Sequence, residues 1–263
     1  MQSTSYPLKT AVINKMTIPF TIRIALCHEM NGFNHFFLDL IRLIAQDLTT
    51  IDREFSPFRS ESLLSHFRNG DLSPLETSDR FAEVFTLSQT AKNETAGFFN
   101  PFFDSGYNPT GLVKGWAINT IFDHRLRPLL ADPEIVGVSF NGGGDIITAV
   151  SSTTRFRWTV GIEDPNDDKL ILGKYDLTNQ GIATSGLNRR GEHIRRTPST
   201  IKQVTIISDS LVFADVWATA GMAAGTGTFN QLINTYRLSG VYVDGLQGQV
   251  PFSRGEIQHV KTP

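Results

Sequence analysis

The stretch that decides the fold is Ile135 to Ser151, with the sequence IVGVSFNGGGDIITAVS. Two runs rich in β-branched residues, Ile135 to Phe140 and Asp145 to Ser151, flank three consecutive glycines. Apolar, β-branched runs separated by glycines predict two strands joined by a tight turn. The chain continues beyond this stretch in further short strands, which we expect at Phe156 to Ile162, Leu170 to Asp176, Val204 to Ser208 and Gly240 to Val243.

Helical spacing of apolar residues dominates the chain before this stretch and returns near its end. We expect a strand at Pro19 to Leu26 and helices at Asn34 to Thr49, Ser73 to Thr90, Pro109 to Leu130, Leu211 to Ala224 and Phe229 to Arg237. Because helices and strands do not alternate regularly, the sequence predicts an α+β fold, with mixed or antiparallel sheets flanked by helices. We expect one compact domain over residues 16–263, preceded by a flexible arm over the polar residues 1–15.

Composition limits the functions that the chain can have. With 263 residues and 40% hydrophobic residues, it is long enough to bury a large core. A formal net charge of −2 argues against a nucleic-acid binder, which would show a basic excess. No apolar run approaches the roughly 20 residues of a membrane span. We therefore expect a soluble, cytoplasmic protein as the sequence is given, although a leader removed beforehand would leave no trace in it.

The cysteine content gives a further constraint. Cys27 is the single cysteine, so neither an intramolecular disulfide nor a cysteine-based zinc site is possible. It directly follows the apolar run Ile22 to Leu26, and we expect it to be buried as a small hydrophobic side chain.

Two segments rich in glycine could bind an anion. In Ser139 to Ile146 (SFNGGGDI), glycines could expose backbone N–H groups to a ligand, but a tight turn between strands explains them as well. In Asn108 to Ala117 (NPTGLVKGWA), Lys114 lies near the expected start of a helix, where phosphate binds well. A solvated surface lysine is the alternative reading of Lys114.

Two other segments carry side chains suited to catalysis. Asp215 and Thr219 are four residues apart in an apolar helix, so their oxygens share one face and could bind Mg2+. A polar helix edge or a helix cap would explain the same pair. His193 could act as a general base, although a structural histidine is the alternative. The residues alone thus indicate an α+β protein that binds a phosphorylated ligand with Mg2+.

A series of segments in consistent order resembles the motifs of the ApbE family, the flavin transferases that move FMN from FAD onto a protein hydroxyl. The resemblance runs from about Met16 to Gly225. The segments are Met16 to Ile24 (MTIPFTIRI), Ile51 to Asn69 (IDREFSPFRSESLLSHFRN), Ala96 to Pro101 (AGFFNP), Asn108 to Ala117, Ser139 to Ile146, Trp158 to Pro165 (WTVGIEDP), Ala183 to Gly186 (ATSG), Glu192 to Ile194 (EHI) and Ala214 to Thr219 (ADVWAT).

This resemblance implies a site for each component of the reaction. It implies a Mg2+ held by Asp215, Thr219 and the backbone carbonyl of Gly111, with His193 as the general base. It implies attack by a Ser or Thr hydroxyl of an acceptor protein on the FMN-side phosphate, which releases AMP. The residues that it implies for the FAD groove are Met16, Phe58, Gly97, Phe98, Phe99, Asn108, Lys114 and Ile194.

The chain departs from the family pattern at three places. Asn108 and Asn100 each stand where the family has aspartate. The segment after His193 reads Ile194 to Thr200 (IRRTPST), without the family's aspartate and closing glycine and with two arginines added. Two alternatives therefore stand beside the transferase: a Mg2+-dependent FAD pyrophosphatase that gives FMN and AMP, and a diverged FAD-binding protein without turnover. Neither the acceptor protein nor the oligomeric state is indicated.

Overall fold

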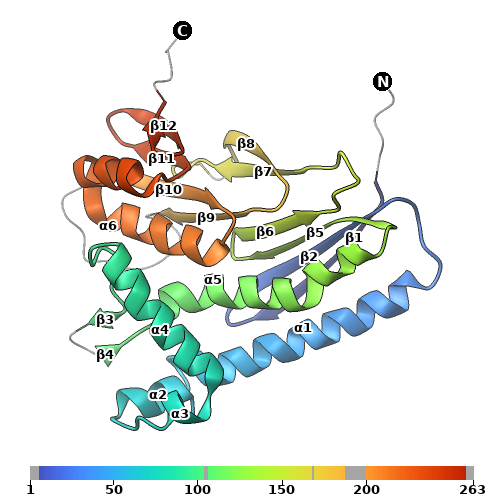
Figure 1. Ribbon diagram of the computed structural model, residues 1–263, viewed down its shortest axis with the longest axis horizontal. Helices are drawn as coiled ribbons and strands as arrows, with labels where there is room; N and C mark the ends of the chain where they lie inside the picture. Colours follow the sequence, from blue (N-terminus) through green and yellow to red (C-terminus); the bar gives the residue numbers. More distant parts are fainter. Residues whose placement is uncertain (1–5, 104–105, 168, 187–199, 259–263) are drawn as a thin grey trace.

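The computed structural model describes residues 6–103, 106–167, 169–186 and 200–258. Among these residues, nine strands form one sheet in the order β1-β2-β5-β6-β9-β10-β11-β12-β13, and every pairing is antiparallel. Helices lie on one side of it (Figure 1). The strands are β1 (Leu8–Lys15), β2 (Ile18–Leu26), β5 (Ile135–Gly142), β6 (Asp145–Val150), β9 (Gly181–Gly186), β10 (Ile201–Ser208), β11 (Gly240–Asp244), β12 (Gly248–Ser253) and β13 (Glu256–Ile257).

The predicted strand pair at the centre of the sequence is confirmed. β5 and β6 pair antiparallel from Gly137↔Val150 to Gly142↔Asp145. Gly143 and Gly144 form the turn with φ of 60° and 99°, values that suit a two-residue hairpin and that glycine adopts without strain. Gly142 ends β5 opposite Asp145, and the turn at Gly143 and Gly144 therefore sets the position of Asp145.

The helices are placed largely as their periodicity predicts. α1 extends the expected helix and buries a stripe from Phe33 to Phe55. α2 and α3 lie beyond the end of α1, farthest from the sheet, and α4 leads back from them to α5 (Figure 1). The helical elements are α1 (Phe33–Phe55), α2 (Leu63–Arg68), α3 (Pro74–Thr77), α4 (Asp79–Glu94), α5 (Thr110–Ile121), the π-helical turn η1 (Phe122–Leu126), the 3-10 turn η2 (Arg127–Ala131) and α6 (Leu211–Tyr236).

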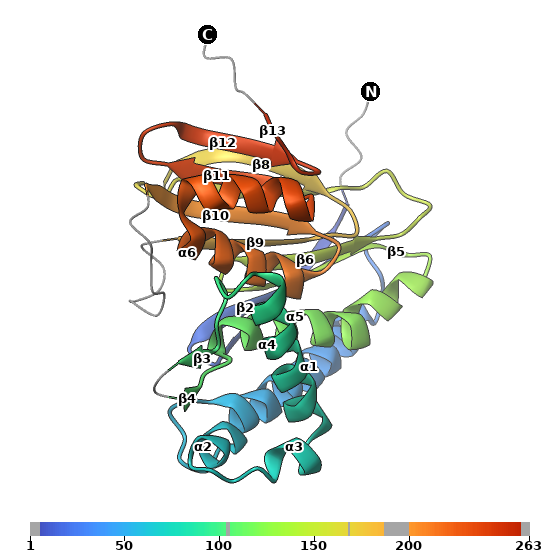
Figure 2. The same ribbon diagram turned by 60° about the vertical axis from the view of Figure 1, so that its left-hand side comes forward.

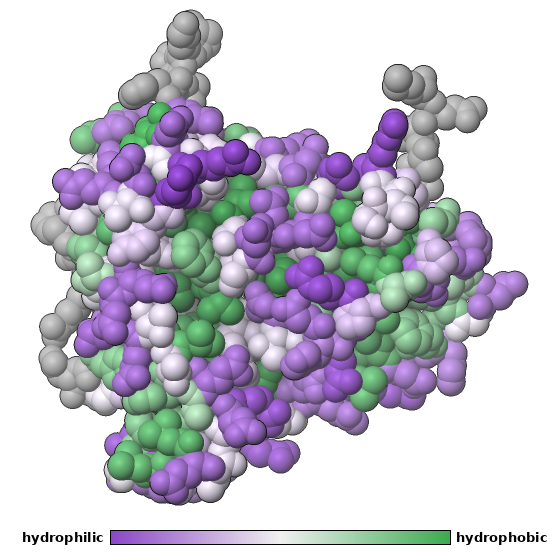
Figure 3. Space-filling view, viewed as in Figure 1, coloured by the Kyte–Doolittle hydropathy of each residue, from purple (hydrophilic) through white to green (hydrophobic). Residues whose placement is uncertain are grey.

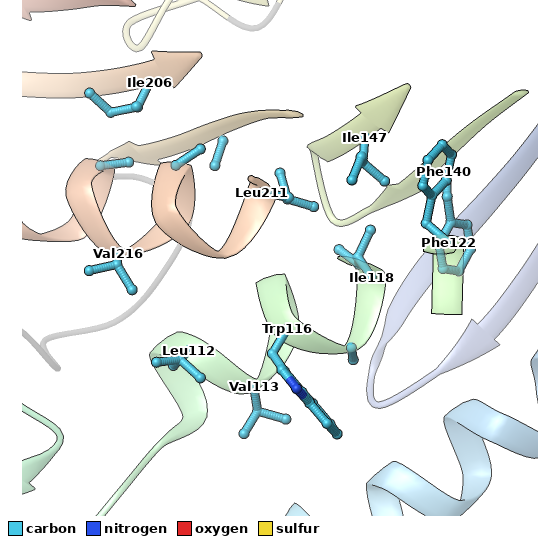
Figure 4. Close-up of a cluster of buried hydrophobic side chains, with 14 of the residues drawn as sticks. Leu112, Val113, Trp116, Ile118, Phe122, Phe140, Ile147, Ile206, Leu211 and Val216 are labelled. Carbon is cyan, nitrogen blue, oxygen red and sulfur yellow. The ribbon is translucent and has the colours of Figure 1, made fainter. Parts of the chain in front are cut away.

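The main core lies between the sheet and the helices α1, α5 and α6. In Figure 4, Ile118 of α5 and Phe122 of η1 lie beside Phe140 and Ile147 of the sheet. α5 is buried without interruption from Leu112 to Ile118, as expected of a helix enclosed on all sides. A charged residue within this layer therefore needs a partner inside the protein.

The flexible arm predicted for residues 1–15 is wrong over Leu8–Lys15, which is strand β1. It pairs with β2 along its whole length, from Leu8↔Ala25 to Lys15↔Ile18. Met16 and Thr17 form the connecting turn, both with positive φ, at 51° and 62°. β1 shows no regular apolar alternation that would have predicted it, because Leu8 and Val12 are exposed and Ile13 is its one buried residue.

The prediction that Cys27 is buried is also wrong, because β2 ends at Leu26 and Cys27 lies exposed directly after it. The backbone N–H of Cys27 donates to Glu134 O at 2.8 Å. The apolar run therefore ends one residue before the cysteine, where the chain leaves the sheet.

The helix expected over Ser73 to Thr90 is two helices. Ser78 is extended, with φ −132° and ψ 108°, and its side chain accepts from Phe81 N at 3.2 Å, which caps α4. The two helices expected near the end of the chain form one element, α6, with a kink at Gly225 (φ 73°, ψ 162°). None of the expected elements covers α2, β9, β12, β13 or the short strands β3 (Phe102–Phe103) and β4 (Gly106–Tyr107).

The far side of the sheet carries the hairpin of β7 (Trp158–Glu163) and β8 (Ile171–Leu177). Figure 2 shows β8 above the central strands and α1 and α5 below them. A cavity of about 240 Å³ lies between this hairpin and the outer faces of β2, β5, β6, β9 and β10. None of the described helices is long and apolar enough to cross a membrane.

Candidate functional site

Three charged side chains meet in the buried layer between the sheet and the helices. Lys114 comes from α5, Asp145 from the start of β6 and Asp215 from the first half of α6. The Lys114 ammonium forms an ion pair with Asp145 Oδ2, and its Nζ lies 3.8 Å from Asp215 Oδ1. The three side chains are only 9%, 1% and 2% exposed, respectively. We call Lys114, Asp145 and Asp215 the buried charge cluster.

Asp145 is held from both sides of its carboxylate. The glycine turn before it starts β6, and alternation along the strand directs Asp145 to the helix-facing side, together with Ile147 and Ala149. Its Oδ1 accepts a hydrogen bond from the backbone N–H of Thr184 in β9 at 3.2 Å. A carboxylate taken out of water requires such compensation, and Lys114 supplies the opposite charge.

Asp215 reaches the cluster because α5 and α6 approach closely. A Cβ on Gly115 of α5 would lie 3.0 Å from both Cβ and Oδ2 of Asp215, so glycine is what permits this contact. The start of α6 is fixed to α5 by a hydrogen bond from Leu211 N to Asn119 Oδ1 at 3.0 Å. Ser210 caps α6 by accepting from Phe213 N at 3.3 Å.

Thr219 lies one turn beyond Asp215, as the sequence spacing predicts. Its Oγ1 is 3.2 Å from Ser185 Oγ of β9. Ser185 belongs to the segment ATSG, so this contact joins two of the segments that sequence analysis singled out. Thr219 is half-buried.

The residues around Asp215 fit a hard divalent cation such as Mg2+. Asp215 Oδ2 is buried and accepts no hydrogen bond from the described residues, so one carboxylate oxygen keeps its full capacity to bind a cation. Gly111, whose carbonyl the resemblance implies as a ligand, lies one helical turn before Gly115. Carboxylate, hydroxyl and carbonyl oxygens are ligands that Mg2+ accepts. The described residues contain no group of three or more His, Cys, Asp or Glu side chains suited to a metal.

The loop Gly97 to Phe99 lies against the start of α5. Gly97 has φ 82°, and Thr95, fully buried, accepts from Phe99 N at 3.0 Å and donates to Ala91 O at 2.7 Å. The ring of Phe99 is buried, and its Cε2 lies 3.3 Å from where a Cβ on Gly111 would be. Phe98 is partly buried. The structure therefore joins this loop to the site through Gly111.

Asn108 makes hydrogen bonds within its own segment, at the start of α5. Its Oδ1 accepts from Thr110 Oγ1 at 2.6 Å and from Thr110 N at 3.3 Å. The preceding Tyr107 is buried in an aromatic cluster, and burial raises the pKa of its hydroxyl although a hydrogen bond with Ser88 acts in the opposite direction. The amide oxygen at position 108 thus accepts the two hydrogen bonds from Thr110 that an aspartate oxygen could also accept.

The remaining predicted flavin contacts lie on separate elements. Met16 lies in the β1–β2 turn, and Phe58 lies between α1 and α2 with 90% of its surface exposed. Figure 3 shows apolar residues gathered at the α2–α3 end of the molecule. Leu72, directly before α3, is also exposed. His193 and Ile194 lie outside the described residues.

No role for Asp145, the acidic residue that follows the three glycines, was predicted from the sequence. The signal that could have placed it was the period of two along β6, which groups Asp145 with the apolar residues of the helix-facing side. Nothing in the sequence pointed to its partner, because Lys114 and Asp145 meet through the packing of α5 on the sheet.

One family model and several solved structures match the chain. A sequence model described as the ApbE family matches residues 108–242, which is just over half of the chain. No curated protein matches the chain.

Solved structures match over almost the whole chain. The flavin transferase ApbE of Vibrio cholerae has 14% identity and a TM-score of 0.72, covering 95% of this chain and 98% of its own. The apo form of the flavinyl transferase ApbE of Pseudomonas stutzeri has 14% identity, a TM-score of 0.70 and 97% coverage of both chains. The ApbE protein of Thermotoga maritima has 15% identity, a TM-score of 0.74 and 97% coverage of both.

These structural matches establish that the fold is that of the ApbE proteins, an α+β fold built on a large antiparallel sheet. The matched residues 108–242 include the whole buried charge cluster together with Gly111 and Thr219. The chain belongs to the ApbE family.

Proposed function

We propose that this protein is a flavin transferase that moves FMN from FAD to a Ser or Thr hydroxyl of an acceptor protein and releases AMP. One observation carries the proposal: Asp215 Oδ2 is buried and accepts no hydrogen bond from the described residues, and it lies beside Gly115 and one turn from Thr219. These residues lie in the segments whose sequences resemble the family's motifs. Family membership and the fold that the chain shares with flavin transferases support the proposal.

Asp215, Thr219 and the Gly111 carbonyl would hold Mg2+. When bound, Mg2+ offsets negative charge that develops on a pyrophosphate during phosphoryl transfer. Asp215 would be the single carboxylate among these three ligands, which suits an ion that shares its coordination with substrate phosphates and water.

The chain's own residues would bind the flavin and move one proton. The loop Gly97 to Phe99 and the segment at Asn108 would line the FAD groove, together with Met16, Phe58, Lys114 and Ile194. The exposed ring of Phe58 could stack on a flat heterocycle. His193 would take the proton of the acceptor hydroxyl, whose oxygen forms the new bond to the FMN phosphorus. The bond from that phosphorus to the bridging oxygen breaks, and AMP leaves with that oxygen.

The test is mass spectrometry of a Thr-containing acceptor domain incubated with this protein, FAD and Mg2+. We expect a mass gain of one FMN phosphodiester on the acceptor and an equal amount of AMP. Asp215→Ala should abolish both products. The control is Asp176→Asn, which changes an exposed carboxylate on the β7–β8 hairpin and should leave both unchanged.

The same assay separates the two alternatives. AMP release at the same rate without any acceptor, and no mass gain, would identify an FAD pyrophosphatase. Tight FAD binding by fluorescence titration with neither AMP nor mass gain would indicate a binding protein without turnover. Undiminished transfer by His193→Ala would overturn the assignment of the base. Full turnover by Asp215→Ala would overturn the metal assignment.

A further inference from the structure

Charge is distributed unevenly within the buried charge cluster. Asp145 has one carboxylate oxygen on Thr184 N and the other on the Lys114 ammonium. Asp215 has one oxygen 3.8 Å from the same ammonium and the other without a hydrogen bond among the described residues. Asp145 is therefore the main counter-ion of Lys114, and Asp215 is the carboxylate that keeps binding capacity.

The pairing of Lys114 with Asp145 affects the binding of any cation at Asp215. An ammonium about 4 Å from a carboxylate competes with an added cation, because both are attracted to the same negative charge and repel each other. Asp145 neutralises Lys114 and so weakens that competition. The net charge of the three groups is −1, and the negative charge that is not neutralised lies on the side of Asp215.

The geometry assigns Asp145 the role of a positioning residue that holds the Lys114 ammonium away from Asp215 and thereby sets the affinity of the site for a divalent cation. This inference rests on the proposed function, because it takes Asp215 as a metal ligand. It also gives Lys114 a role that needs no direct contact with a flavin phosphate. In this role Lys114 is a fixed positive charge beside the proposed metal site, whether or not it also lines the FAD groove.

The experiment measures Mn2+ binding to the whole protein by electron paramagnetic resonance, with and without FAD. Asp145→Asn should lower the affinity for Mn2+ by about 10- to 100-fold, the usual range for losing a residue that orients a metal ligand. Lys114→Met should raise it, because two carboxylates then face the cation without an ammonium. The double variant Lys114→Met/Asp145→Asn should return to within about threefold of the original affinity, since it removes the ammonium and its counter-ion together.

The double variant also keeps the test decisive if Asp145→Asn alone does not fold, because it leaves no unpaired ammonium at this position. The matched control is Asp47→Asn in α1. It breaks the half-buried ion pair of Asp47 with Arg125 of η1, which is not part of the buried charge cluster, and should leave the Mn2+ affinity unchanged. Thermal denaturation of each variant without metal checks that it is folded.

Each other outcome would overturn one named part of the inference or of the proposed function. Loss of Mn2+ binding in the double variant would mean that Asp145 is itself a ligand and would overturn the positioning role. Lower FAD affinity together with unchanged Mn2+ affinity in Lys114→Met would return Lys114 to the flavin phosphate. If the unmodified protein bound no Mn2+ with or without FAD, the metal assignment and this inference would fall together. If the affinities followed the expected order but no flavin transfer occurred, only the proposed reaction would fall.

Discussion

Replacing Gly115 by alanine tests how closely α5 and α6 must approach for Asp215 to reach the site. The added Cβ would lie 3.0 Å from both Cβ and Oδ2 of Asp215. Ordinary van der Waals contact begins at 3.4 Å, so the carboxylate and the helix that carries it must retreat by about 0.4 Å, the difference between 3.4 and 3.0 Å. The displaced oxygen is the one that we propose as a metal ligand.

Two opposing effects decide the stability of Gly115→Ala. Alanine in a helix is favoured over glycine by about 1 kcal/mol. Overpacking of a well-packed interior costs about 1–3 kcal/mol. We therefore expect a change in the free energy of unfolding between none and a loss of about 2 kcal/mol. The effect on Mn2+ affinity should be larger, a loss of about tenfold or more, because a metal ligand moves.

Urea denaturation and Mn2+ titration of the same preparation measure both quantities. The matched control is Gly227→Ala in α6, where an added Cβ meets nothing within 4 Å. This control should gain up to about 1 kcal/mol and bind Mn2+ as before. The reasoning is refuted if Gly115→Ala gains as much stability as Gly227→Ala and its Mn2+ affinity is unchanged.

Three further predictions follow. Thr95→Val should lower the free energy of unfolding by about 1–3 kcal/mol in urea denaturation and weaken FAD binding, because Phe99 N–H loses its buried acceptor. The control, Thr86→Val at an exposed position within α4, should cost little. The pKa of Asp244 is lowered: burial acts to raise it, but hydrogen bonds from two threonine hydroxyls and two backbone N–H groups outweigh this. The contribution of Asp244 to the free energy of unfolding should therefore be complete above the ordinary pKa of 3.8 and be lost as pH falls through the lower pKa of the folded state. In acid denaturation, the stability of Asp244→Asn should fall less with decreasing pH than that of the unmodified protein. Thr17→Gly should raise the melting temperature by relieving about 1 kcal/mol of strain at φ 62°, a result that unchanged or lower melting would contradict.

The parts of the fold that the sequence predicts are those with local causes. The hairpin β5–β6 follows from three glycines, and α1 follows from a stripe of apolar residues at helical spacing. β1 was missed because Leu8 and Val12 face solvent and its order comes from pairing with β2. The extended Ser78 that separates α3 from α4 is a single capping residue within an otherwise helical pattern.

The candidate site also has one part that follows from local sequence and one part that depends on how distant elements pack. Asp215 and Thr219 could be paired from sequence because one helical turn separates them. The contact between Lys114 and Asp145 could not, because it needs both the position of α5 on the sheet and the register of β6 against β9. Only the packed structure reveals that Lys114, a candidate for phosphate binding, lies buried between two carboxylates.

The cost of burying charge indicates that this cluster is kept for a reason other than stability. α5 is buried continuously from Leu112 to Ile118, and α6 is buried from Ala214 to Ala218, so the layer would pack well with apolar side chains alone. Replacing a buried ion pair by apolar residues of similar volume is often neutral or stabilising. A chain that keeps three charges there, and leaves one oxygen of Asp215 without a hydrogen bond among the described residues, loses folding free energy that a bound cation would restore. Saturating Mn2+ should therefore raise the melting temperature of the unmodified protein, and should not raise that of Asp215→Ala.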